Sequence, residues 1–222
     1  MEEKELQAVY DAWRQFFVEN KKNFEYIQIF ENKGPEVGSS LPHPHCQIWS
    51  TQFLPTVIEK MFKNQENYFK KHKTSMLIDY LRKELEKKER IVKELEHFVV
   101  LVPYWAYWPY EMMILPKRNF HSIDQMSENE SKDFMRAIQV LCRKYVKIFE
   151  TPQIPYVMGL RSAPTGSYIN YDFTCWTFHA IFYPPLLSNG RKKFMAGYEL
   201  LAEVQRDFDT SIAAQRLRDV GE

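Results

Sequence analysis

Residues 43–49 read His-Pro-His-Cys-Gln-Ile-Trp and follow a short loop of small residues, Gly38-Ser39-Ser40. Side chains alternate between the two faces of an extended strand, so His43, His45 and Gln47 are expected to share one face. A neutral imidazole can attack or hold a phosphate, and amides and free backbone N–H groups can bind its oxygens. The stretch therefore predicts a strand that carries a phosphate site beside a loop of backbone donors.

Two other interpretations of the histidine pair stay open at this point. A His-x-His pair is also common in metal sites, and a single histidine in an apolar strand is usually a packed core residue. Residues 31–34, Glu-Asn-Lys-Gly, precede the pair and an apolar strand follows it, which argues against a disordered tract. The residue types favour a phosphate or a metal site over packing.

The same order of elements is expected twice along the chain. Ser127 and Glu130 have the spacing of a capping box at the start of the second long helix. Apolar residues recur at helical spacing in both helices, and short apolar strands follow each of them. The expected elements are a helix over 2–20 and strands over 26–30 and 45–49, then a helix from 128 and strands over 156–159 and 176–182. The repeat predicts two related halves.

The two halves are expected to be unequal. A hairpin pattern over residues 97–103 and 110–116 precedes the second unit, and no such pattern precedes the first. We therefore expect an amino-terminally shortened first unit with an unpaired sheet edge. The charged segment between the units has the pattern of a helical pair that lies across the sheet.

These patterns predict an α+β fold, a mostly antiparallel sheet with packed helices in two unequal related halves. The expected divisions are an incomplete first half-unit over 1–55, a helical connector over 56–96, and a second half-unit over 97–222.

Composition excludes several classes of protein. The 222 residues include 30 basic and 29 acidic side chains, for a formal charge of +1, so no nucleic-acid or membrane partner is indicated. No signal-peptide or membrane-spanning apolar run is present. Three cysteines without a CxxC spacing fit a reducing compartment, and a cytoplasmic location is expected.

The stretch around the histidines resembles the active-site segment of a known family. Residues 30–34, 38–40 and 43–49 are similar to the matching segments of galactose-1-phosphate uridylyltransferases, which belong to the histidine-triad superfamily. The resemblance continues in order through most of the chain. It implies a histidine-triad-like fold and uridylyl transfer in galactose metabolism (the Leloir pathway), by double displacement through a uridylyl-histidine intermediate.

The resemblance assigns roles to individual residues. It implies that His45 is the nucleophile and that Gln47 hydrogen-bonds the transferring phosphoryl group. Four positions match residues near the nucleotide phosphates: Glu31, Asn32, Gly38 and Ser40. Five match the segment that contacts the hexose phosphate: Lys193, Phe194, Tyr198, Glu199 and Gln205. The implied partners are UDP-glucose, galactose 1-phosphate, glucose 1-phosphate, UDP-galactose and a second copy of the chain in a homodimer.

The resemblance also implies a zinc site. His43 matches a zinc ligand of the family, but its CxxC and histidine partners have no counterpart here. A second family metal site matches positions where only His179 can coordinate, so packing is the better interpretation of that residue.

Two alternative functions remain. One is a catalytically weak, truncated form that binds nucleotide or a full-length subunit. The other is a nucleotide hydrolase or phosphorylase of the same superfamily, although hydrolases usually carry a third histidine where Gln47 stands.

Overall fold

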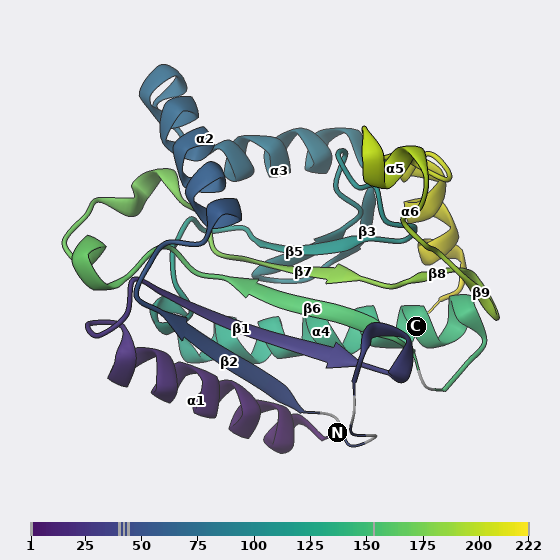
Figure 1. Cartoon of the computed structure of the whole chain (residues 1–222), viewed down its shortest axis with the longest axis horizontal. Coiled ribbons are helices and arrows are strands. Elements are labelled where there is room, and N and C mark those ends of the chain that lie inside the picture. The colour runs from purple at the N-terminus through teal and green to yellow at the C-terminus, as the bar shows by residue number, and fades with distance from the viewer. Residues whose placement is uncertain (1, 40, 42, 44, 153, 222) are drawn as a thin grey trace.

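A single antiparallel sheet organises the chain in the computed structural model, which describes residues 2–39, 41, 43, 45–152 and 154–221. Seven strands follow the order β2-β1-β6-β7-β5-β4-β3 (Figure 1). They are β1 (Tyr26–Lys33), β2 (Cys46–Thr51), β3 (Ile91–Glu94), β4 (Phe98–Leu101), β5 (Met112–Pro116), β6 (Tyr156–Arg161) and β7 (His179–Tyr183). A small ribbon of β8 (Leu186–Ser188) and β9 (Arg191–Lys192) lies outside this sheet.

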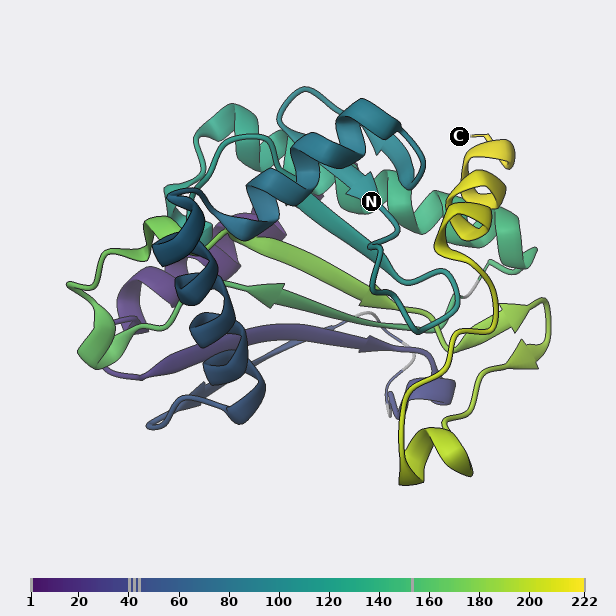
Figure 2. The same ribbon diagram turned by 90° about the horizontal axis from the view of Figure 1, so that it is seen from above.

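Helices cover both faces of the sheet. Two long helices, α1 and α4, share one apolar core with α6, while α2 and α3 contribute to separate cores (Figures 1 and 2). The helices are α1 (Glu3–Asn20), α2 (Thr56–His72), α3 (Met76–Lys87), α4 (Glu128–Phe149), α5 (Tyr198–Leu201) and α6 (Thr210–Asp219). Short 3₁₀ turns lie at η1 (Pro35–Val37), η2 (Ile123–Gln125), η3 (Gly166–Tyr168) and η4 (Phe173–Cys175). Within the described residues, no helix has both the length and the apolar character that a membrane span requires.

The two repeated units meet in the middle of the sheet. β1 of the first unit pairs with β6 of the second, with Phe30 opposite Gly159. β2, which begins just after His45, and β7, which begins at His179, lie on the outer sides of that central pair. The predicted α+β fold and antiparallel sheet are confirmed.

The predicted capping box at α4 is confirmed atom by atom. The N–H of Glu130 donates to Oγ of Ser127 at 3.3 Å, and the N–H of Ser127 donates to Oε2 of Glu130 at 2.8 Å. α1 uses the same device, because the N–H of Glu2 donates to Oε2 of Glu5 at 2.7 Å. Each pair satisfies N–H groups that have no partner inside the helix.

Two strands begin later than the sequence pattern predicted. β2 begins at Cys46, so His45 lies just outside it, and β7 begins at His179 instead of residue 176. Before β7, the N–H of Phe178 donates to the carbonyl of Phe120 at 2.7 Å. The backbone there is engaged with a loop, which keeps Phe178 out of the ladder.

The segment expected as a helical connector is helical only in part. α2 and α3 fill most of residues 56–96, but Ile91–Glu94 forms β3, which pairs with β4 at one edge of the sheet. Ile91 and Val92 are buried there, and β-branched side chains suit a strand. The division of the chain at residues 55 and 96 stays a prediction.

Candidate active site

His45 is held immediately before β2 by a hydrogen bond within its own segment. Its Nδ1 lies 2.9 Å from the carbonyl oxygen of His43. Because a carbonyl only accepts, Nδ1 carries the proton, and in the neutral ring Nε2 keeps its lone pair. The imidazole of His45 is half-buried, whereas His43 is exposed. His45 is therefore a ring with a fixed tautomer and an available nucleophilic nitrogen.

The strand after His45 sorts its side chains between two faces. Gln47 lies opposite Phe30 of β1, whose ring meets Trp49 edge-on at 5.7 Å between centroids. Cys46 packs into the core under α1, and burial raises the pKa of its thiol to about 12. A thiol with that pKa stays protonated near neutral pH, so Cys46 is not the nucleophile. His45 precedes the strand and lines the same cavity as Cys46. The prediction that His45 and Gln47 share one face of the strand is therefore wrong.

This cavity, which we call the α1–α4 cavity, has a volume of about 490 Å³. It lies between α1 and α4 beside His45, and apolar side chains make most of its wall. The lining residues are Leu6, Val9, Ala12, Trp13, Glu31, Lys33, His45, Cys46, Met135, Ile138, Gln139, Cys142, Tyr156 and Met158. A space of this size is large enough for a small ligand or for side chains of another segment.

Glu31 is the buried acid of this cavity. Its exposure is 8%, and its Oε2 accepts a hydrogen bond from the hydroxyl of Tyr156 at 2.9 Å. Burial raises the pKa of Glu31, while the Tyr156 hydrogen bond and the nearby Lys33 and His45 act in the opposite direction. Tyr156 is a contact that the sequence did not reveal, because it lies on β6, far along the chain.

The loop before the histidines is a closed turn and not an open row of donors. The N–H groups of Val37, Gly38 and Ser39 donate to carbonyls of Gly34 or Pro35 at 3.1–3.3 Å. Gly38 closes this turn with φ +80°, a conformation that favours glycine. The predicted free N–H groups are therefore absent at these three positions, because the turn satisfies them itself.

Asn32 and Ser40 are the other two residues predicted to lie near the nucleotide phosphates, and the structure describes only the first. Asn32 is half-buried in β1, opposite Val157 of β6. Ser40 lies outside the described residues.

The residues expected near the hexose lie on a segment, residues 193–205, that we call the hexose segment. The side chain of Lys193 is only 6% exposed, and its Nζ pairs with Glu199 at 2.6 Å and with Asp207 at 3.0 Å. Phe194, Tyr198 and Gln205 are exposed. Asp207 is a partner that the sequence did not reveal. The cluster fixes Lys193 and Glu199 together, away from bulk solvent.

One ion pair ties the base of the hexose segment to the loop before the histidines. Nζ of Lys192 in β9 lies 3.9 Å from Oε1 of Glu36 in η1. The two parts of the predicted site therefore approach each other at one end of the sheet (Figure 1). No described contact joins the side chains of the hexose segment directly to His45.

His179 has the packing role that the sequence indicated. It is 2% exposed, and its Nδ1 lies 2.9 Å from the carbonyl oxygen of Thr177. Burial lowers the pKa of His179 to about 4. Among the residues that the structure describes, no three His, Cys, Asp or Glu side chains converge on a metal position. The described donors near His43 thus do not form a tetrahedral zinc set, and the zinc at His43 stays a prediction.

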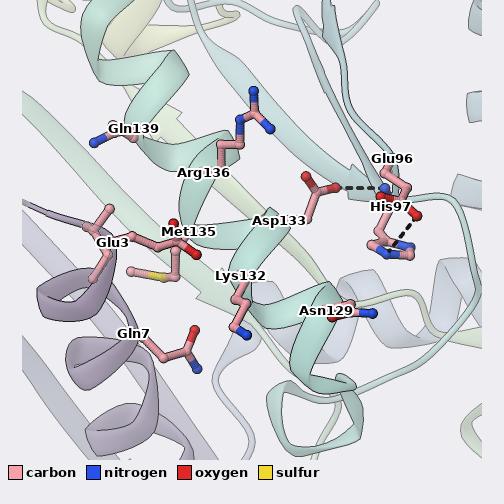
Figure 3. A pocket seen from close by; sticks show the side chains of 11 residues that line it. Glu3, Gln7, Glu96, His97, Asn129, Lys132, Asp133, Met135, Arg136 and Gln139 are labelled. Atoms are coloured by element: carbon pink, nitrogen blue, oxygen red, sulfur yellow. Dashed lines mark hydrogen bonds and ion pairs between the residues drawn. The ribbon is translucent and has the colours of Figure 1, made fainter.

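A second cavity of about 450 Å³ adjoins the first between the start of α1 and α4 (Figure 3), and Leu6, Met135 and Gln139 line both. Its wall is mixed in charge, with Lys132 and Arg136 beside Glu3 and Asp133. Asp133 accepts a hydrogen bond from the N–H of His97 at 2.7 Å. None of the predicted site residues lines this second cavity.

Comparison with known families gives two adjoining matches. The N-terminal domain of galactose-1-phosphate uridyl transferase matches residues 1–55, and the C-terminal domain of the same family matches residues 60–222. A galactose-1-phosphate uridylyltransferase of Haemophilus influenzae is 44% identical over 98% of this chain and 62% of its own length. The enzyme of that name from Rattus norvegicus is 42% identical over 96% of this chain and 56% of its own. The chain thus spans about three fifths of the length of these curated relatives.

Solved structures agree on the fold. A structure described as uridylyltransferase superposes with a TM-score of 0.86 at 28% identity, over 98% of this chain and 67% of that one. An ADP-glucose phosphorylase of Arabidopsis thaliana superposes with a TM-score of 0.85 at 18% identity, over 100% of this chain and 68% of that one. The second similarity concerns the fold alone.

Proposed function

The chain belongs to the galactose-1-phosphate uridylyltransferase family, and on that premise we propose that it transfers uridylyl groups between UDP-glucose and a hexose 1-phosphate. The observation that carries the proposal is the hydrogen bond from Nδ1 of His45 to the carbonyl of His43. It leaves Nε2 as the lone-pair nitrogen, which a nucleophile at phosphorus requires.

The proposed reaction has two displacements at the same phosphorus. Nε2 of His45 forms a bond to the α-phosphorus of UDP-glucose, and the bond from that phosphorus to glucose 1-phosphate breaks. The phosphate oxygen of galactose 1-phosphate then attacks the uridylyl-histidine, UDP-galactose forms, and the imidazole leaves with its electron pair. The carbonyl of His43 keeps the Nδ1 proton in place and stabilises the positive charge that the ring gains in the first displacement and loses when it leaves in the second.

Neighbouring residues have supporting roles in this proposal. Gln47 is proposed to donate its amide to a phosphoryl oxygen. Asn32, Gly38 and Ser40 are proposed to lie near the nucleotide phosphates. Glu31 is proposed to act on His45 through its charge, since the two groups interact electrostatically across the cavity.

The hexose segment is proposed to bind the sugar phosphate. Oε1 of Glu199 is bonded to Lys193, which leaves its second oxygen to accept a sugar hydroxyl. Phe194 and Tyr198, 71% and 61% exposed, can contact the sugar ring or a neighbouring subunit. Gln205 is included as a further polar contact. We propose a homodimer in which this segment contributes to the active site of the partner subunit. The proposed location is the cytoplasm.

Zinc enters no step of this mechanism. His43 matches a family zinc ligand, and among the described residues the donors around it do not form a ligand set.

A second candidate function is a catalytically weak subunit that binds nucleotide or a longer partner. The observation that favours it is the pairing of Lys193 with two carboxylates. These carboxylates neutralise the positive charge with which Lys193 is proposed to bind a phosphate.

Covalent labelling separates the two candidates. UDP-glucose that carries radiolabel in its α-phosphate should label the chain through an acid-labile phosphoramidate, and His45→Ala should abolish the label. His72→Ala is the matched control, because that histidine lies on α2, away from the site. Galactose 1-phosphate should release the label as UDP-galactose. Equal labelling of wild type and His45→Ala would remove His45 from the mechanism, and no labelling of the wild type would favour the weak subunit.

A further inference from the structure

Arg161 ends β6 and carries a positive charge into the middle of the sheet. Its neighbour Leu160 belongs to the core under α1 and α4, so the alternation of side chains places Arg161 on the opposite face. Its register partner on β7 is His179. Arg161 is half-buried, while His179, Tyr26 and Trp176 beside it are at most 2% exposed. A guanidinium therefore lies among almost fully enclosed side chains.

Gln28 of β1 is oriented so that it accepts a hydrogen bond from this guanidinium. Its Nε2 donates to the carbonyl oxygens of Ile29 at 2.8 Å and of Leu160 at 2.9 Å, which uses both amide hydrogens. Its Oε1 is thereby turned toward Arg161 and accepts from Nη1 at 2.6 Å. The backbone of the sheet thus fixes the amide that holds the guanidinium.

Two buried rings complete the surroundings of Arg161. The hydroxyl of Tyr26 is hydrogen-bonded to the guanidinium and donates to Oε1 of Gln28 at 3.3 Å. Nε1 of Trp176 donates to the carbonyl oxygen of Arg161 at 3.2 Å. Both rings belong to the apolar cluster under α2. The described hydrogen-bond partners of the guanidinium, Gln28 and Tyr26, are neutral, so its positive charge is retained at this point of the sheet.

The second metal site implied by the family resemblance falls on this part of the sheet, at Met61, Arg161, His179 and Ile181. A metal ion there requires lone pairs from several side chains. Ile181 has none and is 7% exposed in the apolar cluster under α3, and the half-buried Met61 packs against the apolar cluster under α2. Arg161 is itself a cation. The residues present do not fit a metal ion.

We propose that Arg161 is a built-in structural cation, which takes the place of a metal ion and ties β6 to β1 through Gln28 and Tyr26. A guanidinium suits this role because it stays charged at any physiological pH, brings five N–H donors, and needs no deprotonated ligands. The fold of this chain is then independent of metal at this position. The inference concerns the sheet and does not rest on the proposed transferase activity.

Thermal unfolding of Arg161→Met tests the tie between the strands. Methionine keeps an unbranched apolar side chain and removes the charge and the donors. We expect the melting temperature to fall by on the order of 5 °C, because buried acceptors lose a charged donor. Arg14→Met on α1 is the matched control, since Arg14 is exposed, and it should change the melting temperature by less than about 1 °C. Equal melting temperatures for Arg161→Met and wild type would overturn the proposal.

A second experiment asks whether a metal ion can bind once the guanidinium is removed. In Arg161→His, two imidazoles face each other across β6 and β7, where cross-strand side chains are close enough to share an ion. With Zn²⁺ as the probe, we expect calorimetry to show one more bound ion than in the control Arg161→His/His179→Gln. Zinc should also raise the melting temperature of Arg161→His above that of this control. No additional zinc in Arg161→His would contradict the exchange of one cation for another.

The wild-type chain supplies the converse test. Its melting temperature and that of His179→Gln should respond equally to zinc, because the guanidinium keeps metal away from His179. This comparison also cancels any zinc bound elsewhere on the chain. A zinc-induced stabilisation that wild type shows and His179→Gln lacks would overturn the proposal, by assigning a metal ion to the position of Arg161.

Discussion

His45 and His179 are fixed by the same hydrogen bond and differ in what surrounds them. In both, Nδ1 lies 2.9 Å from the carbonyl oxygen two residues earlier. His45 is half-buried at the mouth of a cavity, while His179 is 2% exposed. The shared bond sets the tautomer, and burial then decides that only His45 offers its second nitrogen to a ligand.

The tautomer of His45 is directly measurable. We expect long-range ¹H–¹⁵N correlation spectra above pH 8 to show the Nδ1–H form of His45, because the His43 carbonyl accepts that proton. His72 serves as a reference ring. A predominant Nε2–H form at His45 would contradict the proposed nucleophile.

His179 should make stability fall in mild acid. Burial lowers its pKa from 6.5 to about 4, so between these values the unfolded chain binds more protons than the folded one. The stabilisation is complete above pH 6.5 and is lost as pH falls toward 4, by on the order of 3 kcal/mol at most. Urea unfolding of His179→Gln should lack this pH dependence. An unchanged slope in the variant would assign the dependence to other groups.

Glu111 should make the stability of the fold decline as pH rises, opposite to the effect of His179. It is 1% exposed, and burial raises its pKa from 4.5 to about 7, against hydrogen bonds from the N–H groups of Tyr107 and Trp108. The folded state therefore keeps a proton that the unfolded state loses, and this contribution declines as pH rises from 4.5 to 7. Glu111→Gln should be more stable than wild type at pH 8 and similar at pH 4.5. Equal stability at pH 8 would contradict the buried, neutral carboxyl.

Lys193 should stabilise the folded state, in addition to its proposed contact with the sugar phosphate. Lys193→Ala leaves Glu199 and Asp207 unpaired, and we expect a loss of about 1–3 kcal/mol, less than a fully buried pair because both acids are partly exposed. Lys192→Ala removes an exposed neighbour and should cost less than about 0.5 kcal/mol. Denaturant unfolding of the two variants checks the difference, and equal values would exclude the cluster as a stabilising element.

Ser127 should stabilise the fold through its cap at the start of α4 alone. Ser127→Ala removes the acceptor for the N–H of Glu130, and we expect a loss of about 1 kcal/mol. Ser211→Ala in α6 is a control, because its hydroxyl donates to Asp209 and caps no helix itself. A loss for Ser127→Ala no larger than the control's would contradict the capping role.

Interactions between residues close in sequence were readable before the structure. The Ser127–Glu130 cap and the hairpin of β4 and β5 depend on spacing, so the sequence predicted both. Side-chain alternation likewise placed Cys46 and Gln47 on opposite faces. The motif also predicts His45 as the nucleophile, because the chemistry of imidazole and the resemblance to the family lie within a few residues; that role stays a prediction.

Tertiary structure decided what depends on distant partners. Pairing of β1 with β6 joins segments more than a hundred residues apart, and no local pattern specifies which strands become neighbours. Burial depends on that assembly, and it separates the roles of two histidines with the same hydrogen bond. It also gives Glu31 its Tyr156 partner and Lys193 its Asp207 partner. Sequence fixes chemistry and local geometry here, while desolvation and pairing arise only when the chain closes around each group.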